Sequence, residues 1–303
     1  MPLAAGDLAG LEPLKTIRSR WPMVIGGLLT AAMIVGLGRA LLGSGLAGLR
    51  QAAPGDPRFY LFTALLYFSP VTGDFVIFRR LWRIPAAGYA ALVKKRIANE
   101  VVFGYSGEAY FYAWARARAR MVAAPFGAVK DVSILSAIAG NAITLAMVAV
   151  ALPLGHALLD AETLRIVGWS AAITFAISLP FLLFSKRVFS LPRKTLWWIF
   201  GVHCLRLLAG SVLIALSWHY ALPQVSLGMW LFLAAGRLLV SRLPLVPNKD
   251  LLFANFAIIL IGEGRRLSEL MAFSAALVLL IHVVLIAGFS LRSLTTRTSP
   301  WTS

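Results

Sequence analysis

Long apolar stretches alternate with short polar connections along most of the chain. A helix needs about 20 mostly apolar residues to cross the hydrocarbon core of a bilayer. Five stretches are clear candidates. Two others each contain a charged residue, Asp74 inside one and Arg237 near the end of the other. The pattern therefore predicts seven membrane spans, at 21–42, 59–78, 132–152, 166–184, 196–218, 226–240 and 267–289.

Two further stretches, 97–115 and 251–261, are apolar enough to enter the bilayer but are short or broken by polar residues and glycine. We expect them to be re-entrant or interfacial segments. Non-helical backbone is tolerated at membrane depth only where protein buries it or it lines a wet cavity, so both would mark an internal cavity. The predicted fold is an all-α polytopic membrane protein, with a cytoplasmic segment over 1–20, one transmembrane domain over 21–290 and a tail over 291–303.

The composition excludes a water-soluble globule, because 59% of the residues are apolar, only 14% are charged and the mean hydropathy is +0.81. In so apolar a chain, the formal charge of +17 predicts contact with lipid headgroups and no nucleic-acid partner. A single cysteine, Cys204, excludes an internal disulfide and multi-cysteine metal sites. The four histidines lack metal-ligand spacing. We expect no metal and no cofactor.

Lysine and arginine gather in alternate connections between the predicted spans. Because cytoplasmic loops carry the excess of these residues, the distribution predicts a cytoplasmic N-terminus in an inner (cytoplasmic) membrane. Seven spans would leave Arg292 and Arg297 on the opposite side. A full crossing by 251–261 would move them inside, so the side of the C-terminus stays open.

The segment 94–110 is the most informative stretch of the chain. It joins a basic cluster to an apolar run that holds two carboxylates, an amide and two glycines. Ionisable groups at membrane depth are costly and therefore mark functional sites. We expect Glu108 to pair with Arg96 or Arg116. The alternative is an amphipathic helix whose basic residues touch anionic headgroups at the cytoplasmic face.

Several motifs follow one another here. Arg-Leu-Trp-Arg at 80–83 precedes Arg96-x-x-Asn99 and then Gly104-x-x-Gly107-Glu108, ahead of an aromatic-rich helix. Leu-Pro-Leu-Val-Pro-Asn at 243–248 precedes the last span. Over roughly 15–290, this order resembles the membrane region of lysylphosphatidylglycerol synthases and their stand-alone flippase-like relatives. The chain departs from that pattern in lacking a proline before Gly104 and in carrying Asn-Lys-Asp at 248–250.

The resemblance implies a flippase-like protein that moves lipid. No synthase domain follows the membrane region in this sequence, so we expect no aminoacyl transfer. The implied partner is an anionic phospholipid or a lipid-linked amphiphile. The predicted substrate-binding residues are Arg96, Asn99, Glu100, Gly107, Glu108, Arg206 and Arg237.

Arg206 and Arg237 enter that set for a physical reason. A phosphate headgroup can pass through the membrane only along a cavity lined by cations and other donors, and both arginines lie within predicted spans. His203 precedes Arg206 by one turn, so the two share a helix face. The alternative is that the long arginine side chains extend to the cytoplasmic interface.

Asp74 is the candidate for ion coupling. It follows Pro70 and Gly73, which favour a kinked or broken helix, and a broken helix with a carboxylate is a familiar device for coupling transport to an ion or a proton. The alternative is a helix-end carboxylate paired with Arg79 or Arg80.

Two other functions stay open. One is a membrane-embedded enzyme acting on a lipid headgroup or a polyprenyl phosphate, which would need the carboxylates Asp74, Glu100 and Glu108 to converge. The chain has neither a Gly-x-Ser-x-Gly elbow nor a phosphate-binding Gly-x-x-x-x-Gly-Lys loop, so catalysis is the less favoured reading. The other is a non-transporting scaffold subunit. The glycine-rich first span permits a homo-oligomer.

Overall fold

A computed structural model describes residues 53–101, 106–119, 125–155, 161–183, 188–242, 253, 257, 261 and 264–297. Within these residues the regular structure is entirely helical, which confirms the all-α prediction for this part of the chain. The helices are α3 (Pro57–Trp82), α4 (Ala87–Val101), α5 (Ser106–Ala119), α6 (Pro125–Gly155), α7 (Ala161–Leu183), α9 (Arg193–Ala221), α10 (Leu227–Arg242) and α12 (Gly264–Arg297).

Four of the described helices are long and apolar enough to cross a membrane. They lie in α3, α6, α9 and α12 and cover the predicted spans at 59–78, 132–152, 196–218 and 267–289. Helix α7 covers all but the last residue of the predicted 166–184 stretch, and α10, with 16 residues, covers all but the first residue of 226–240. The first predicted span, the Leu-Pro element at 243–248 and all but three residues of the 251–261 segment lie outside the described residues. The count of seven spans and the re-entrant course of 251–261 therefore remain predictions.

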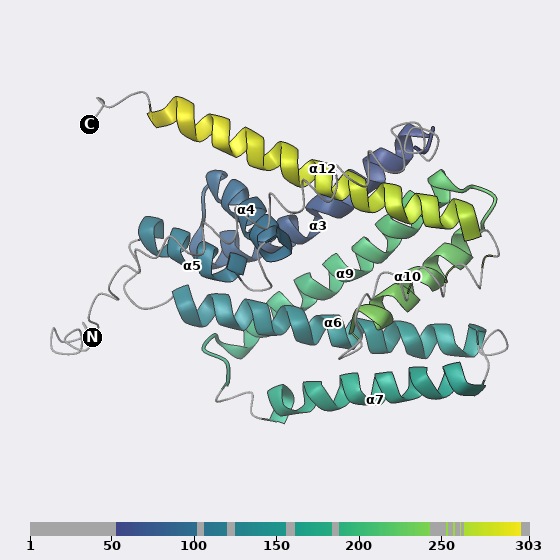
Figure 1. Cartoon of the computed structure of the whole chain (residues 1–303). Coiled ribbons are helices and arrows are strands. Elements are labelled where there is room, and N and C mark those ends of the chain that lie inside the picture. Colours follow the sequence, from purple (N-terminus) through teal and green to yellow (C-terminus); the bar gives the residue numbers. More distant parts are fainter. Residues whose placement is uncertain are drawn as a thin grey trace.

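Some of the long helices run alongside one another and others cross (Figure 1). Helices α6 and α7 lie side by side, while α9 crosses α6 and packs most extensively against α3. The shorter α4 and α5 form a pair that packs on α3 and α6. Helix α12 contacts α3 through the Phe59–Phe273 ring pair and α4 through Lys94, whose ammonium lies 4.9 Å from the Phe289 ring centre.

Helix α3 has well-defined ends and an interrupted middle. The Asp56 carboxylate accepts a hydrogen bond from the Arg58 backbone N–H at 2.9 Å and caps the first turn. At the other end Arg83 is left-handed, with φ of 52°, and its N–H donates to the Arg79 carbonyl. Pro70 lies inside the helix and has no N–H, so one backbone hydrogen bond is missing at the centre of a membrane-length helix.

Two apolar cores hold the helices together. One joins α3, α4, α5, α6 and α9, with Phe78 and Phe111 at its centre and their ring centroids 4.6 Å apart. The other joins α9 and α10 through Trp218 and Trp230, and Phe253 stacks on Trp218. Large apolar side chains such as Leu205 stay exposed on the outside, as expected for helices in contact with lipid.

The predicted re-entrant segment at 97–115 consists of the end of α4 and most of α5, with 102–105 outside the described residues. The two helices touch closely. The Gly107 N–H donates to Asn99 Oδ1 at 2.7 Å, and the Ser106 hydroxyl donates to the Ala98 carbonyl at 2.7 Å. A Cβ added to Gly107 would overlap the Lys95 carbonyl group, so only glycine fits at this contact. The depth of the helix pair in the bilayer remains a prediction.

We therefore expect Gly107→Ala to lower the free energy of unfolding by about 1–3 kcal/mol or more, because backbone atoms of α4 must move to admit the methyl group. The matched control is Gly201→Ala, where an added Cβ meets no atom within 4 Å. Alanine there should be neutral or stabilising by up to about 1 kcal/mol. Reversible unfolding in detergent micelles measures both. Equal effects would contradict the close contact.

Candidate functional site

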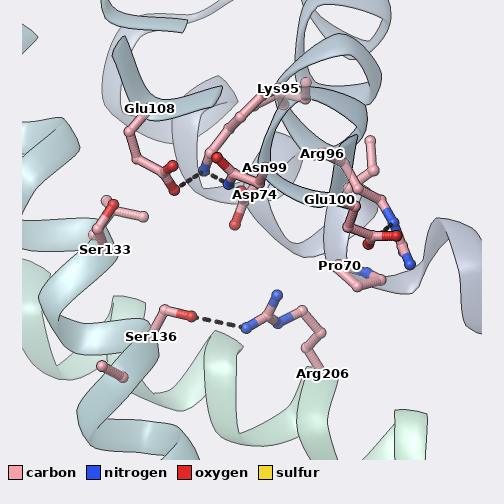
Figure 2. Close-up of a pocket in the computed structure, with 14 residues that line it drawn as sticks. Pro70, Asp74, Lys95, Arg96, Asn99, Glu100, Glu108, Ser133, Ser136 and Arg206 are labelled. Carbon is pink, nitrogen blue, oxygen red and sulfur yellow. Dashed lines mark hydrogen bonds and ion pairs between the residues drawn. The ribbon is translucent and has the colours of Figure 1, made fainter. Parts of the chain in front are cut away.

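A cavity of about 330 Å³ lies among α3, α4, α5, α6 and α9 (Figure 2). We call it the charged cavity. Its size is within the usual range of small-molecule sites, and its walls are unusually rich in charge for the interior of an apolar helix bundle. It is lined by Pro70, Val71, Asp74, Leu92, Lys95, Arg96, Asn99, Glu100, Glu108, Val132, Ser133, Ser136, Ala137 and Arg206.

Lys95 holds the centre of one wall. Its ammonium lies 2.7 Å from Asp74 Oδ2 and 3.3 Å from Glu108 Oε1, and so joins α3, α4 and α5. Its side chain is only 9% exposed. Burial alone would lower the pKa of Lys95, but the carboxylates of Asp74 and Glu108 hold it above its usual value. The ammonium is therefore charged at neutral pH and has fixed partners.

Arg96 and Glu100 form a second charged group. They lie one turn apart on α4, with Arg96 Nε 2.9 Å from Glu100 Oε1. Arg96 also donates to the Tyr67 carbonyl, and its guanidinium lies 4.2 Å from the Tyr67 ring centre. The other Glu100 oxygen lies 3.2 Å from His282 Nε2. This group ties α4 to α3 and to α12.

Arg206 differs from the other two cations. It projects from α9 into the charged cavity, and its Nη2 donates to the Ser136 hydroxyl at 3.0 Å (Figure 2). No carboxylate among the described residues lies within ion-pair distance of it, and its buried Nε has no hydrogen-bond partner there. The buried Ser133 hydroxyl nearby also lacks one. Arg206 therefore offers free donors and a positive charge to whatever enters the cavity.

Helix α3 leaves room for Arg206. A Cβ added to Gly73 would lie 2.7 Å from Arg206 Cδ, so the glycine lets the arginine stem pass close to the α3 backbone. Pro70, one turn earlier, lines the same wall. The Pro70 and Gly73 positions thus place the guanidinium opposite Ser136.

A second cavity of about 180 Å³ lies on the other side of Arg206, between α3, α9 and α10. We call it the α10 cavity. It shares Pro70 and Arg206 with the charged cavity, and Arg237 lines it. Arg206 therefore lines two neighbouring spaces.

The structure brings most of the predicted site residues together. Arg96, Asn99, Glu100, Glu108, Arg206 and Asp74 all line the charged cavity. Gly107 lies in the contact between α4 and α5 beside it, and Arg237 lines the α10 cavity instead. This convergence concerns position alone, and the binding and coupling roles remain predictions.

The partners of Asp74 and Glu108 differ from the expected ones. Both carboxylates contact Lys95. Arg79 and Arg80, expected beside Asp74, lie over the rings of Phe75 and Trp198. Arg96, expected beside Glu108, is engaged by Glu100. The other expected partner, Arg116, has a side chain outside the described part of the structure. The physical reason is the tight pairing of α4 with α5 against α3, which turns Lys95 toward both carboxylates.

Sequence reasoning missed four contributors to the site: Lys95, Ser133, Ser136 and His282. Lys95 was hidden in the Lys94-Lys95-Arg96 run, although its spacing of four from Asn99 places both on one face of α4. Ser133 and Ser136 carried a similar signal, because their spacing of three places two hydroxyls on one face of an apolar helix. Nothing in the sequence pointed from His282 to Glu100.

No family model matches this chain, and neither does any curated protein or solved structure. The resemblance to lysylphosphatidylglycerol synthases therefore stays a prediction that rests on the motifs. Function has to be argued from the charged cavity itself.

We expect Lys95→Met to lower the free energy of unfolding by about 3–5 kcal/mol, because two buried carboxylates would lose their counter-charge. The triple variant Lys95→Met, Asp74→Asn, Glu108→Gln removes the uncompensated charges and should recover a large part of that loss. Denaturant unfolding of the full chain in micelles measures both. A single variant as stable as the unmodified protein would contradict the role of Lys95.

Proposed function

We propose that this protein is a flippase-like membrane protein that binds the anionic headgroup of a phospholipid or lipid-linked amphiphile at Arg206 and moves it across an inner (cytoplasmic) membrane, with the N-terminus on the cytoplasmic side. The observation that carries the proposal is the position of Arg206. It is a cation without a carboxylate partner among the described residues, inside a membrane-length helix, and it lines two neighbouring cavities.

A headgroup phosphate matches what Arg206 offers. A guanidinium donates to phosphate oxygens in a bidentate fashion, and such charge-assisted bonds are strongest where water is scarce. Ser136 already orients the guanidinium, and the free Ser133 hydroxyl supplies a further donor on the same face of α6. The apolar outer faces of the helices leave the acyl chains in contact with the bilayer while the headgroup passes inside.

Charge balance supports a role for ion coupling. The cavity holds three cations, Lys95, Arg96 and Arg206, and three carboxylates, so its formal charges cancel when it is empty. A bound phosphate adds negative charge beside Asp74 and Glu108. That charge favours the uptake of a proton or a small cation by one of these carboxylates. Asp74 is our candidate because it lies on α3 beside both Lys95 and Pro70.

One observation favours the alternative of a membrane-embedded enzyme. Asp74, Glu100 and Glu108 do converge on one cavity, as acid–base chemistry on a headgroup would require. Each of them, however, is held by a cation or by His282, whereas Arg206 is left free. Binding of an anion is therefore better supported than proton transfer.

The test reconstitutes the purified full chain into liposomes that contain a trace of phosphatidylglycerol with a fluorescent acyl chain. Dithionite then quenches the label in the outer leaflet. We expect quenching to go beyond one leaflet with the unmodified protein and to fall at least about tenfold in rate with Arg206→Gln, because one charge-assisted contact is lost. Zwitterionic phosphatidylcholine with the same label should move more slowly.

Lys194→Gln is the matched control, since Lys194 is an exposed cation on the same helix and lines neither the charged cavity nor the α10 cavity. It should leave the rate unchanged. Quenching of one leaflet alone with every form would contradict translocation of this lipid. Mass spectrometry of the same vesicles tests the enzyme alternative, which predicts an altered headgroup.

A further inference from the structure

A third cavity, of about 520 Å³, lies between α6, α7 and α9, and we call it the apolar groove. It shares no lining residue with the charged cavity, because the two spaces lie against different faces of α6. Its walls are Leu135, Ile138, Ala142, Leu145, Phe175, Ser178, Phe189, Arg193, Leu196, Trp197 and Phe200.

Among the described residues that line this groove, Ser178 and Arg193 carry hydroxyl or charged groups, and Ser178 already has hydrogen-bond partners. Ser178 accepts a hydrogen bond from Asn141 at 2.9 Å and donates to the Thr174 carbonyl at 3.0 Å. Arg193 is exposed, and no other described residue forms an ion pair or a hydrogen bond with its guanidinium. The described part of the groove therefore presents the positive charge of Arg193 on a mostly apolar wall.

The charge lies at one end of the groove. Arg193 is the first residue of α9, and the segment before it is fixed to α6 by Asp131, which is fully buried. Asp131 Oδ2 accepts from the backbone N–H groups of Ser190 and Leu191 at 2.7 and 2.8 Å. From that end the groove follows α6 to Leu145, about 15 Å away at 1.5 Å per residue.

We propose that the apolar groove binds an anionic phospholipid, with an acyl chain along α6 and the phosphate at Arg193. An apolar slot that ends in a single cation fits a molecule with an apolar chain and an anionic head. This site is separate from Arg206, and the proposal that it binds lipid does not depend on whether the protein transports lipid.

Charge also argues against the predicted first span of this chain as the occupant. That span is preceded by Lys15, Arg18 and Arg20, and the predicted orientation places these cations on the same side as Arg193. Like charges would meet at the Arg193 end of the groove, whereas a phosphate would be attracted there.

The test titrates the purified full chain in detergent with phosphatidylglycerol and with phosphatidylcholine of the same acyl chains, and counts bound lipids by native mass spectrometry. We expect Arg193→Gln to weaken phosphatidylglycerol binding about fivefold, the worth of one cation beside an anionic lipid, and to weaken phosphatidylcholine binding less, because the choline cation offsets the charge of its phosphate. Ala142→Phe places a ring in the groove and should weaken binding of both lipids.

Lys194→Gln removes the neighbouring charge, which does not line the groove. An equal loss with Lys194→Gln and Arg193→Gln would mean diffuse attraction to the surface and would overturn the proposal. Wild-type binding by both Arg193→Gln and Ala142→Phe would overturn it as well. The proposal would also be overturned if the unmodified protein bound no lipid and Ala142→Phe destabilised it, because another part of the chain would then fill the groove. Glycerol 3-phosphate should not compete, since it lacks the acyl chain.

Discussion

The burial of the Lys95 ammonium group determines how the helices around the charged cavity are arranged. Lys95 is almost inaccessible, and its charge is tolerable only because Asp74 and Glu108 approach it from two other helices. The arrangement requires α4 and α5 to touch, which Gly107 permits, and requires both to pack on α3. A cation of the α4–α5 pair thus specifies where that pair lies on the long helices.

That arrangement has a consequence for Arg206. Lys95 engages Asp74 and Glu108, and Arg96 engages Glu100, so the carboxylates of the cavity have cationic partners before Arg206 is considered. Arg206 is left with a serine hydroxyl and two adjoining spaces. The apolar groove on another face of α6 has a similar feature, because Arg193 is the one cation among the described residues that line it. Both proposals for lipid binding rest on cations that have no carboxylate partner among the described residues.

Much of the helical framework could be predicted from the sequence, because a run of about 20 apolar residues has few structural alternatives. Several residues of the charged cavity could also be predicted from the sequence. Asp74, Glu108 and Arg206 place charges within apolar segments, and a charge there is costly unless it has a function. The partners of these side chains could not be predicted from the sequence. Whether Asp74 meets Arg80 or Lys95 depends on how α4 packs against α3, and no local spacing encodes that packing. The contact of His282 with Glu100 joins residues far apart in sequence for the same reason.

The most direct test of the account is the electrostatic character of the space around Arg206. Cys204 is the only cysteine of the chain, so Cys204→Ser gives a background in which Ser136→Cys is the single thiol. We expect an anionic methanethiosulfonate to modify this thiol about tenfold faster than a cationic one of similar size, and Arg206→Gln to remove the preference. Equal rates for the two reagents, or a faster cationic reagent, would contradict an anion-binding cavity at this position.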